Sequence, residues 1–237
     1  MNIFPILSIY FFYMVQELRR QFNEHFTQEK YDAFVTDLNK AHSRIQFRSA
    51  ETPVFVPKHF YEQMISACER IVDVILQPDF KELTKNAIPP HLAVKNEDKY
   101  PDCITFDFGV CMNERNELEP QLIEMQAFPT LFAYEVLLDD TFKKHFDVPS
   151  NYSSYLGGLN RTSYLQLLKE LLLKDFEAEN VILLEIFPHQ QKTNIDFYCT
   201  EDYIGVKPVC VTELIKKGNS LYYMREGKET LIKRIYN

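Results

Sequence analysis

The chain has 237 residues, enough for one large domain or two modest ones with a substantial core. Hydrophobic residues make up 46% and charged residues 25%, which is close to the average of folded proteins and excludes a largely disordered chain. The formal net charge of −8, without any dense run of Lys and Arg, argues against nucleic acid as a partner.

The N-terminal residues 2–15 are almost wholly apolar. This stretch is shorter than the roughly 20 residues of a membrane-spanning helix, Pro5 interrupts it, and it lacks the features of a secretory signal. We therefore expect a buried or partner-covered segment, or residues upstream of a start near Met14, and no membrane partner. The alternative is an anchor on a membrane surface.

Two helical regions follow. In residues 15–43 apolar side chains recur at spacings of three to five, which predicts one amphipathic helix or two abutting ones, the second capped by Thr27. A second helix is predicted over 59–76, and a short one at 79–86.

The next elements are two strands within 104–127 and a helix over 131–146. The segment 147–163 is rich in turn-forming residues and contains the only Gly-Gly pair of the chain. We therefore place a domain boundary between residues 156 and 157.

The C-terminal part has the pattern of a βαβ unit. A helix around 162–175 precedes 181–187, a continuous apolar run typical of a strand buried on both faces. A helix over 191–205, ended by Gly205, then leads to a second buried strand at 207–214. This order implies a right-handed crossover and a Rossmann-like half-sheet.

The chain closes with a predicted hairpin that turns at Glu226 and Gly227. The predicted fold class is therefore α/β, in two domains. Residues 1–156 form a helical region with an antiparallel hairpin sheet, and residues 157–237 form the Rossmann-like unit.

The five cysteines occur singly and in odd number, without the C-x-x-C spacing of zinc or redox sites. Such thiols are typical of a reducing compartment, so we expect a cytoplasmic protein. The six histidines are also dispersed, with no pair three or four residues apart, which argues against a zinc site.

The predicted hairpin brings two carboxylates together. If its turn is centred between residues 115 and 116, Asp107 faces Glu124 and Thr105 faces Gln126. Because facing residues of an antiparallel pair share a face, these four side chains would lie on one side of the hairpin. A second, apolar set would line the other side as part of the core: Phe106, Phe108, Ile123 and Met125.

Two like charges in opposed positions destabilise a sheet unless something compensates for them. One compensation is a divalent cation, because carboxylates and an amide oxygen are hard ligands suited to Mg²⁺. The alternatives are a solvated face, or a basic side chain from elsewhere in the fold. A one-residue change of register would separate the pair.

The sequences "FDFGV" (106–110) and "ELEPQLIEMQAFPT" (117–130) resemble the metal-binding hairpin of ATP-grasp ligases. The order of the elements, hairpin first and Rossmann-like unit afterwards, resembles the circularly permuted branch of that family that includes glutathionylspermidine synthetase. The segment "ENVILLEIFPHQQKTNIDFY" (179–198) is similar to the substrate-side unit of the same proteins. The resemblance covers roughly residues 100–237.

The resemblance implies that Asp107, Glu124 and Gln126 bind Mg²⁺ and, with it, ATP. Gln126 stands where Asn is usual, and Thr105 where an Arg is usual. The implied activity is ATP- and Mg²⁺-dependent joining of a carboxylate to an amine through an acyl-phosphate. The lysine-bearing nucleotide lid of the permuted proteins would lie beyond this stretch, so we expect an incomplete ATP-grasp-like fold, the N-terminal portion of a ligase.

The alternative is a non-catalytic binding or scaffolding module of the same ancestry, which Thr105 and the absent lid favour. For a ligase, small-molecule substrates are expected near His189, Lys192 and Asn194, because these residues follow a buried strand and open α/β sheets bind ligands there.

Overall fold

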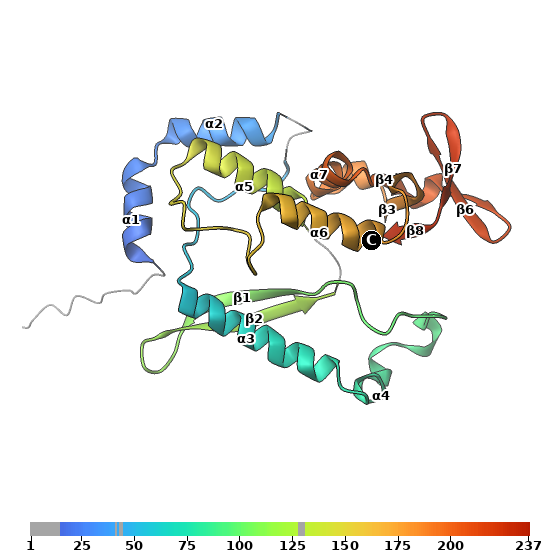
Figure 1. The fold of residues 1–237 in the computed structure, drawn as a ribbon, viewed down its shortest axis with the longest axis horizontal. Helices are drawn as coiled ribbons and strands as arrows, with labels where there is room; N and C mark the ends of the chain where they lie inside the picture. Colours follow the sequence, from blue (N-terminus) through green and yellow to red (C-terminus); the bar gives the residue numbers. More distant parts are fainter. Residues whose placement is uncertain (1–14, 41, 43–44, 128–130) are drawn as a thin grey trace, which may run out of the picture. The chain divides into compact units, whose positions relative to one another are not determined.

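The computed structural model describes residues 15–40, 42, 45–127 and 131–237 (Figure 1). These residues belong to two compact units. The first, here called the hairpin unit, comprises Met1–Asn23 and Thr52–Ala127, and the second, the sheet unit, comprises Glu24–Glu51 and Phe128–Asn237. The predicted boundary between residues 156 and 157 lies inside the sheet unit, and this domain assignment stays a prediction. The N-terminal apolar segment 2–15, predicted to be buried or covered by a partner, lies almost entirely outside the described residues.

The hairpin unit is built around a two-stranded antiparallel sheet. Its helices are α3 (Lys58–Ile75), the short α4 (Phe80–Leu83) and most of α1 (Gln16–His25), and its strands are β1 (Thr105–Met112) and β2 (Leu118–Gln126). Helix α3 packs along β2, as Figure 1 shows. Two short 3-10 turns, Lys85–Ala87 and Pro90–Leu92, lie between α4 and the hairpin.

Few side chains of the hairpin unit are buried. Among its described residues only Phe22, Phe55 and Phe60 are, and the rings of Phe22 and Phe55 meet edge to face with centroids 6.3 Å apart. No described residue of β1 or β2 is buried. The unit therefore has little core of its own to hold it together.

The described residues of the sheet unit form two sheets with α-helices packed around them. Strands β3 (Val181–Glu185), β4 (Lys207–Cys210) and β8 (Arg234–Tyr236) form a parallel sheet in the order β4-β3-β8. Strands β5 (Ile215–Lys217), β6 (Ser220–Arg225) and β7 (Lys228–Ile232) form an antiparallel one. The helices are α2 (Gln28–Leu38), α5 (Tyr134–His145), α6 (Arg161–Leu173) and α7 (Asn194–Ile204).

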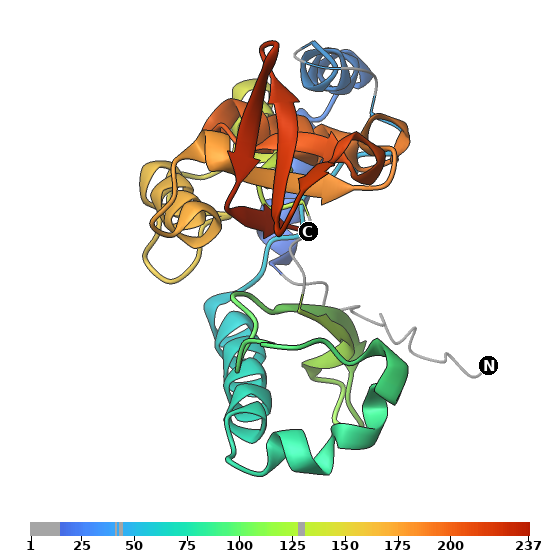
Figure 2. The same ribbon diagram turned by 90° about the vertical axis from the view of Figure 1, so that its right-hand side faces the viewer.

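The two sheets share a core. Ile182 and Val209 of the parallel sheet pack against Tyr223 of β6, whose hydroxyl donates to the carbonyl of Glu179 at 2.9 Å. Figure 2 shows the red C-terminal strands lying across the orange strand β3. Residues 181–183 are buried in succession, and hence on both faces, which explains the apolar run over residues 181–184 of β3.

Helices α2 and α5 lie side by side and form a second, aromatic core (Figure 1). Phe34 is fully buried, and its ring meets those of Phe142 and Phe146 at centroid distances of 5.5 and 5.8 Å. At the edge of this contact Asp37 accepts hydrogen bonds from Lys144 and His145 of α5. These contacts with Lys144, together with Lys40 and His145, hold the pKa of Asp37 far below its usual value.

A buried carboxylate joins α7 to α5. Asp196, in the first turn of α7, accepts hydrogen bonds from the backbone N–H groups of Ala133 and Tyr134 at 2.9 and 2.8 Å. It thereby satisfies donors at the start of α5 that have no partner within that helix. Burial raises the pKa of Asp196 to about 6, despite these two hydrogen bonds.

The mixed α/β fold class is confirmed, including the antiparallel hairpin and the parallel β3–α7–β4 unit. Two local predictions are also confirmed: the Thr27 side chain caps α2 by accepting from the N–H of Lys30, and Gly205 ends α7 with φ +85°. Of the two alternatives for residues 15–43, the described residues follow the second and form two helices. One prediction needs correction: the strand expected over 207–214 ends at Cys210, where a 3-10 turn begins.

Strands β5 and β8 were not predicted. Each has only three residues, too few to show a period in the sequence. Among the described helices, none is long and apolar enough to cross a membrane.

Candidate functional site

The β1–β2 hairpin has the predicted pairing. Asp107 lies opposite Glu124, and Thr105 lies opposite Gln126. Past Asp107 the register shifts by one residue at a bulge, so that Phe108 pairs with Leu122 and Ile123 is left as the extra residue of β2.

The turn and the bulge together create this pairing. The side chain of Asn113 accepts from the N–H groups of Arg115 and Glu117, both at 2.9 Å, and closes a loop over residues 113–117. With that loop alone, Asp107 would face Ile123. The extra residue in β2 restores Glu124 to the opposite position, so the expected turn centre was half a residue in error and the bulge compensates for it.

Both carboxylates are exposed, and neither has a hydrogen-bond or ion-pair partner among the residues that the structure describes. The described part of the chain therefore supplies no basic side chain to offset the two charges of Asp107 and Glu124. A solvated face and a cation site remain as the two interpretations of the pair.

Thr105 provides a further oxygen at this face. Its hydroxyl is buried and has no hydrogen-bond partner within the described residues, and it lies across from Gln126, which is half-buried. Two carboxylates, an amide oxygen and a hydroxyl oxygen on one face are hard donors, and they fit Mg²⁺ in kind. Nowhere in the described chain do three or more His, Cys, Asp or Glu side chains form a group able to hold a metal. The predicted Mg²⁺ ligands are two carboxylates, Asp107 and Glu124, and the amide of Gln126.

The apolar side of the hairpin differs from the prediction. Phe106 and Phe108 are half-buried, but 70% of Ile123 and 43% of Met125 are exposed. The expectation that all four line the core was therefore wrong, because the bulge removes Ile123 from the alternation of the strand.

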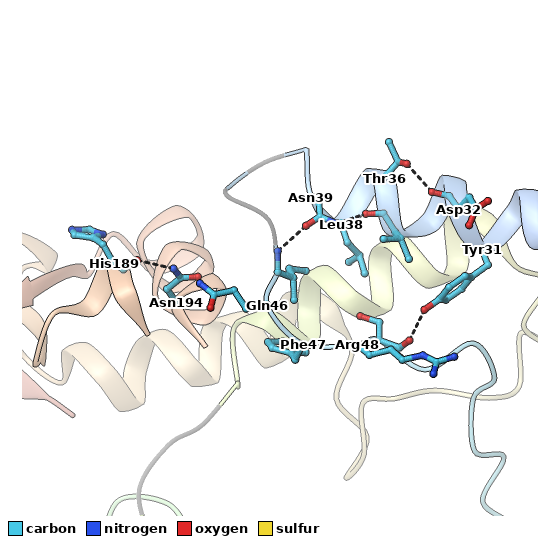
Figure 3. Close-up of a pocket in the computed structure, with 13 residues that line it drawn as sticks. Tyr31, Asp32, Thr36, Leu38, Asn39, Gln46, Phe47, Arg48, His189 and Asn194 are labelled. Carbon is cyan, nitrogen blue, oxygen red and sulfur yellow. Dashed lines mark hydrogen bonds between the residues drawn. The ribbon is translucent and has the colours of Figure 1, made fainter. Parts of the chain in front are cut away.

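A second candidate site is a pocket of about 990 Å³ that lies wholly within the sheet unit. Helix α2 forms one wall, the segment 45–49 forms another, and His189 and Asn194 close one end (Figure 3). Of the three residues predicted to contact substrate, two thus line the pocket, and Lys192 does not. Their role in substrate binding stays a prediction.

The connection from β3 to α7 positions His189 and Asn194. The 3-10 turn Pro188–Gln190 follows β3, and Asn194 is the first residue of α7. The Asn194 amide nitrogen donates to the carbonyl of His189 at 3.1 Å. The His189 ring stacks on Tyr198 with centroids 5.8 Å apart, and its Nδ1 lies 2.9 Å from the Tyr198 hydroxyl.

The opposite wall of the pocket was not predicted. Tyr31 donates its hydroxyl hydrogen to the carbonyl of Ser49 at 2.7 Å, and the Asn39 side chain accepts from the N–H of Ile45 at 2.7 Å. These bonds hold the segment 45–49 against α2 and leave a hollow between them (Figure 3). The only signal in the sequence was the polar Asn39 at the end of the apolar pattern of α2, which is also typical of an ordinary helix end.

No protein-family model matches the chain, and no curated protein matches its sequence. Among solved structures, the fold is similar to that of a glutathione synthetase-like effector from Globodera pallida in its apo form, with a TM-score of 0.55 and 13% sequence identity. The match covers 94% of this chain and 57% of that chain, so this chain spans a little over half the length of the effector. At such low identity the likeness concerns the fold.

Proposed function

We propose that the chain acts in the ATP- and Mg²⁺-dependent joining of a carboxylate to an amine (C–N ligation), as a ligase of the ATP-grasp type. One observation carries the proposal. Asp107 and Glu124 face each other across β1 and β2, exposed and without a partner among the described residues. Such a pair is destabilising by itself and favourable around a hard cation.

In this proposal Asp107, Glu124 and the amide oxygen of Gln126 hold Mg²⁺ and, with it, the phosphates of ATP. A bound Mg²⁺ would offset negative charge that develops on the phosphoryl oxygens. The chain's own part is to keep the two carboxylates on the same face of the hairpin, which the bulge after Asp107 ensures. The likeness to a glutathione synthetase-like protein supports this choice of reaction class.

The sheet unit would take the small-molecule carboxylate or amine substrate, near His189, Lys192 and Asn194 at the end of β3. Open parallel sheets bind ligands at this end of their strands. The five cysteines are free thiols, which supports the cytoplasmic location included in the proposal.

A second candidate is a non-catalytic binding or scaffolding module. The observation that favours it is Thr105, which stands opposite Gln126 where the family pattern has an Arg able to contact a phosphate. The solved protein with a similar fold is also named an effector, and this name describes that protein.

Thermal unfolding with Mg²⁺ and ATP tests the metal site. A ligand at 100 times its dissociation constant should stabilise the protein by about 2.7 kcal/mol. We expect this shift with Mg²⁺ and ATP together, and its loss in Asp107→Asn. The matched control is Glu119→Gln, a carboxylate of the same strand pair that lies opposite Cys111 and should leave the shift unchanged.

ADP release separates the two functions. A ligase should release ADP when a carboxylate and an amine substrate are supplied with Mg²⁺ and ATP. ADP release that depends on both substrates would therefore refute the non-catalytic module. A shift that persists in Asp107→Asn would refute the metal site itself.

A further inference from the structure

The pocket of the sheet unit contains a buried hydrogen-bond acceptor without a donor. Asn194 is 3% exposed, and its Oδ1 has no hydrogen-bond partner among the described residues. An acceptor taken out of water and left unpaired lowers stability. A molecule that donates a hydrogen bond to this oxygen would remove the penalty.

The orientation of the Asn194 amide follows from its surroundings. Its nitrogen donates to the carbonyl of His189, and a flipped amide would place oxygen against oxygen there. The oxygen therefore lies on the side away from His189, next to Gln46 in Figure 3. Stacking on Tyr198 keeps His189 in place.

The rest of the pocket is mainly apolar and has no excess of charge. Val35, Leu38, Ile45 and Phe47 contribute apolar or aromatic surface.

The charged lining residues are Asp32 and Arg48, one of each sign, and both have partners. Asp32 accepts a hydrogen bond from Gln28, and Arg48 forms an ion pair with Glu51. A phosphate or another multiply charged ligand would find no counter-charge here, whereas a neutral one fits.

We propose that this pocket is a second ligand site, which takes a neutral molecule with an N–H donor, such as a primary carboxamide, beside a flat apolar group. The donor binds Asn194 Oδ1 and the apolar group lies among Val35, Leu38 and Phe47. His189 and Asn194 also belong to the region proposed above for the ligase substrate, but the present proposal rests on the unpaired Asn194 oxygen and not on the hairpin carboxylates or on ligase activity.

Gln46 is the side chain that must move to admit the ligand. It is exposed, has no hydrogen-bond partner among the described residues, and lines the same pocket as Asn194 (Figure 3). Its long side chain has several rotamers of similar energy, so it can turn aside at small cost.

Two probes of equal ring size test the proposal. Benzamide has the N–H donor, and methyl benzoate has the same ring without it. Each is titrated into the full chain without Mg²⁺ or ATP, and the backbone amide resonances of Ile45 and Phe47 are followed by NMR. We expect saturable shifts with benzamide and about tenfold weaker binding of methyl benzoate, the value of one well-formed hydrogen bond.

Three variants locate the acceptor. Asn194→Leu should abolish the preference for benzamide, and the matched control Gln190→Ala, an exposed residue close in sequence but outside the pocket lining, should preserve it. Gln46 is exposed, so the Gln46→Ala variant should fold. It therefore tests whether Asn194 is the recognition group even if Asn194→Leu does not fold. The preference for benzamide should survive in it.

The proposal is overturned if neither probe shifts these resonances, or if both bind equally well. It is also overturned if Gln46→Ala abolishes the preference, because Gln46 would then be the recognition group. These outcomes leave the hairpin metal site untouched, since no nucleotide or metal is present in the titration.

Discussion

The hairpin unit and the sheet unit owe their structures to different forces. In the sheet unit, α2, β3 and β6 bury large apolar side chains and Asp196 joins two helices through buried hydrogen bonds. In the hairpin unit, β1 and β2 pair regularly although no described residue of either strand is buried. The comparison teaches that packing positions the pocket, whereas turn chemistry and one bulge position the carboxylate pair.

The largest expected difference between the units is the effect of removing an apolar side chain. Phe34 of α2 is fully buried among aromatic rings, so Phe34→Ala should lower the free energy of unfolding by about 3–5 kcal/mol. Ile123→Ala, at the bulge of the hairpin, should change it by less than about 0.5 kcal/mol. Urea unfolding followed by circular dichroism measures both, and equal effects would refute the contrast.

The second expected effect is a fall in the stability of the sheet unit as the pH rises from about 4 to 6. The folded pKa of Asp196 is raised to about 6, so the folded state holds a proton that the unfolded state has released. The rise from the ordinary pKa of 3.8 corresponds to about 3 kcal/mol of folding stability, which is present below pH 4 and lost above pH 6. Urea unfolding at several pH values measures it.

Asp196→Asn keeps an acceptor oxygen for Ala133 and Tyr134 without titrating, so it should flatten this pH dependence. Burial and the Asp196 charge also raise the pKa of Glu135, which adds a smaller effect of the same sign. Asp37 affects stability only at lower pH, because the contribution of its lowered pKa to folding is lost as the pH falls below about 4. A pH dependence unchanged in Asp196→Asn would contradict the assignment.

Two glycines provide a smaller contrast. Gly205 has φ +85°, and an added Cβ would lie 3.3 Å from that of Ala178, so Gly205→Ala should cost about 1–2 kcal/mol. Gly109 lies within strand β1, where an added Cβ would meet its neighbours at 3.6 Å or more. Gly109→Ala should therefore be neutral or slightly stabilising. Thermal unfolding of both variants checks the prediction. A clear loss of stability in Gly109→Ala would show that the side chains around β1 are packed more closely than the structure indicates.

The smallest expected effect concerns the carboxylate pair without metal. Asp107→Asn removes one of two opposed negative charges, so in EDTA it should stabilise the hairpin unit by a few tenths of a kcal/mol to about 1 kcal/mol. Added Mg²⁺ and ATP should reverse the order of wild type and variant. Hydrogen exchange of the β1 and β2 amides measures this locally, and a destabilised variant in EDTA would show that the two charges do not repel.

Much of the local structure was predictable because it depends on a few residues. The cap at Thr27, the end of α7 at Gly205 and the opposition of Asp107 to Glu124 all follow from short-range patterns. The last of these was obtained with an incorrect turn centre, because the bulge at Ile123 leaves no mark on the alternation of residue types. The two three-residue strands, β5 and β8, were too short to detect.

From the sequence alone we could predict the longer helices and strands, their order and the carboxylate pair of the hairpin, because hydrogen bonding and side-chain alternation act between close neighbours in the chain. Only the tertiary structure decided which faces are buried, and it alone brought α2 and the segment 45–49 to the start of α7. The unpartnered oxygen of Asn194 is a product of that assembly. The partners of that pocket are far apart in the chain, so no local pattern showed that they would meet, although local apolar runs did indicate that β3 and β4 would be buried.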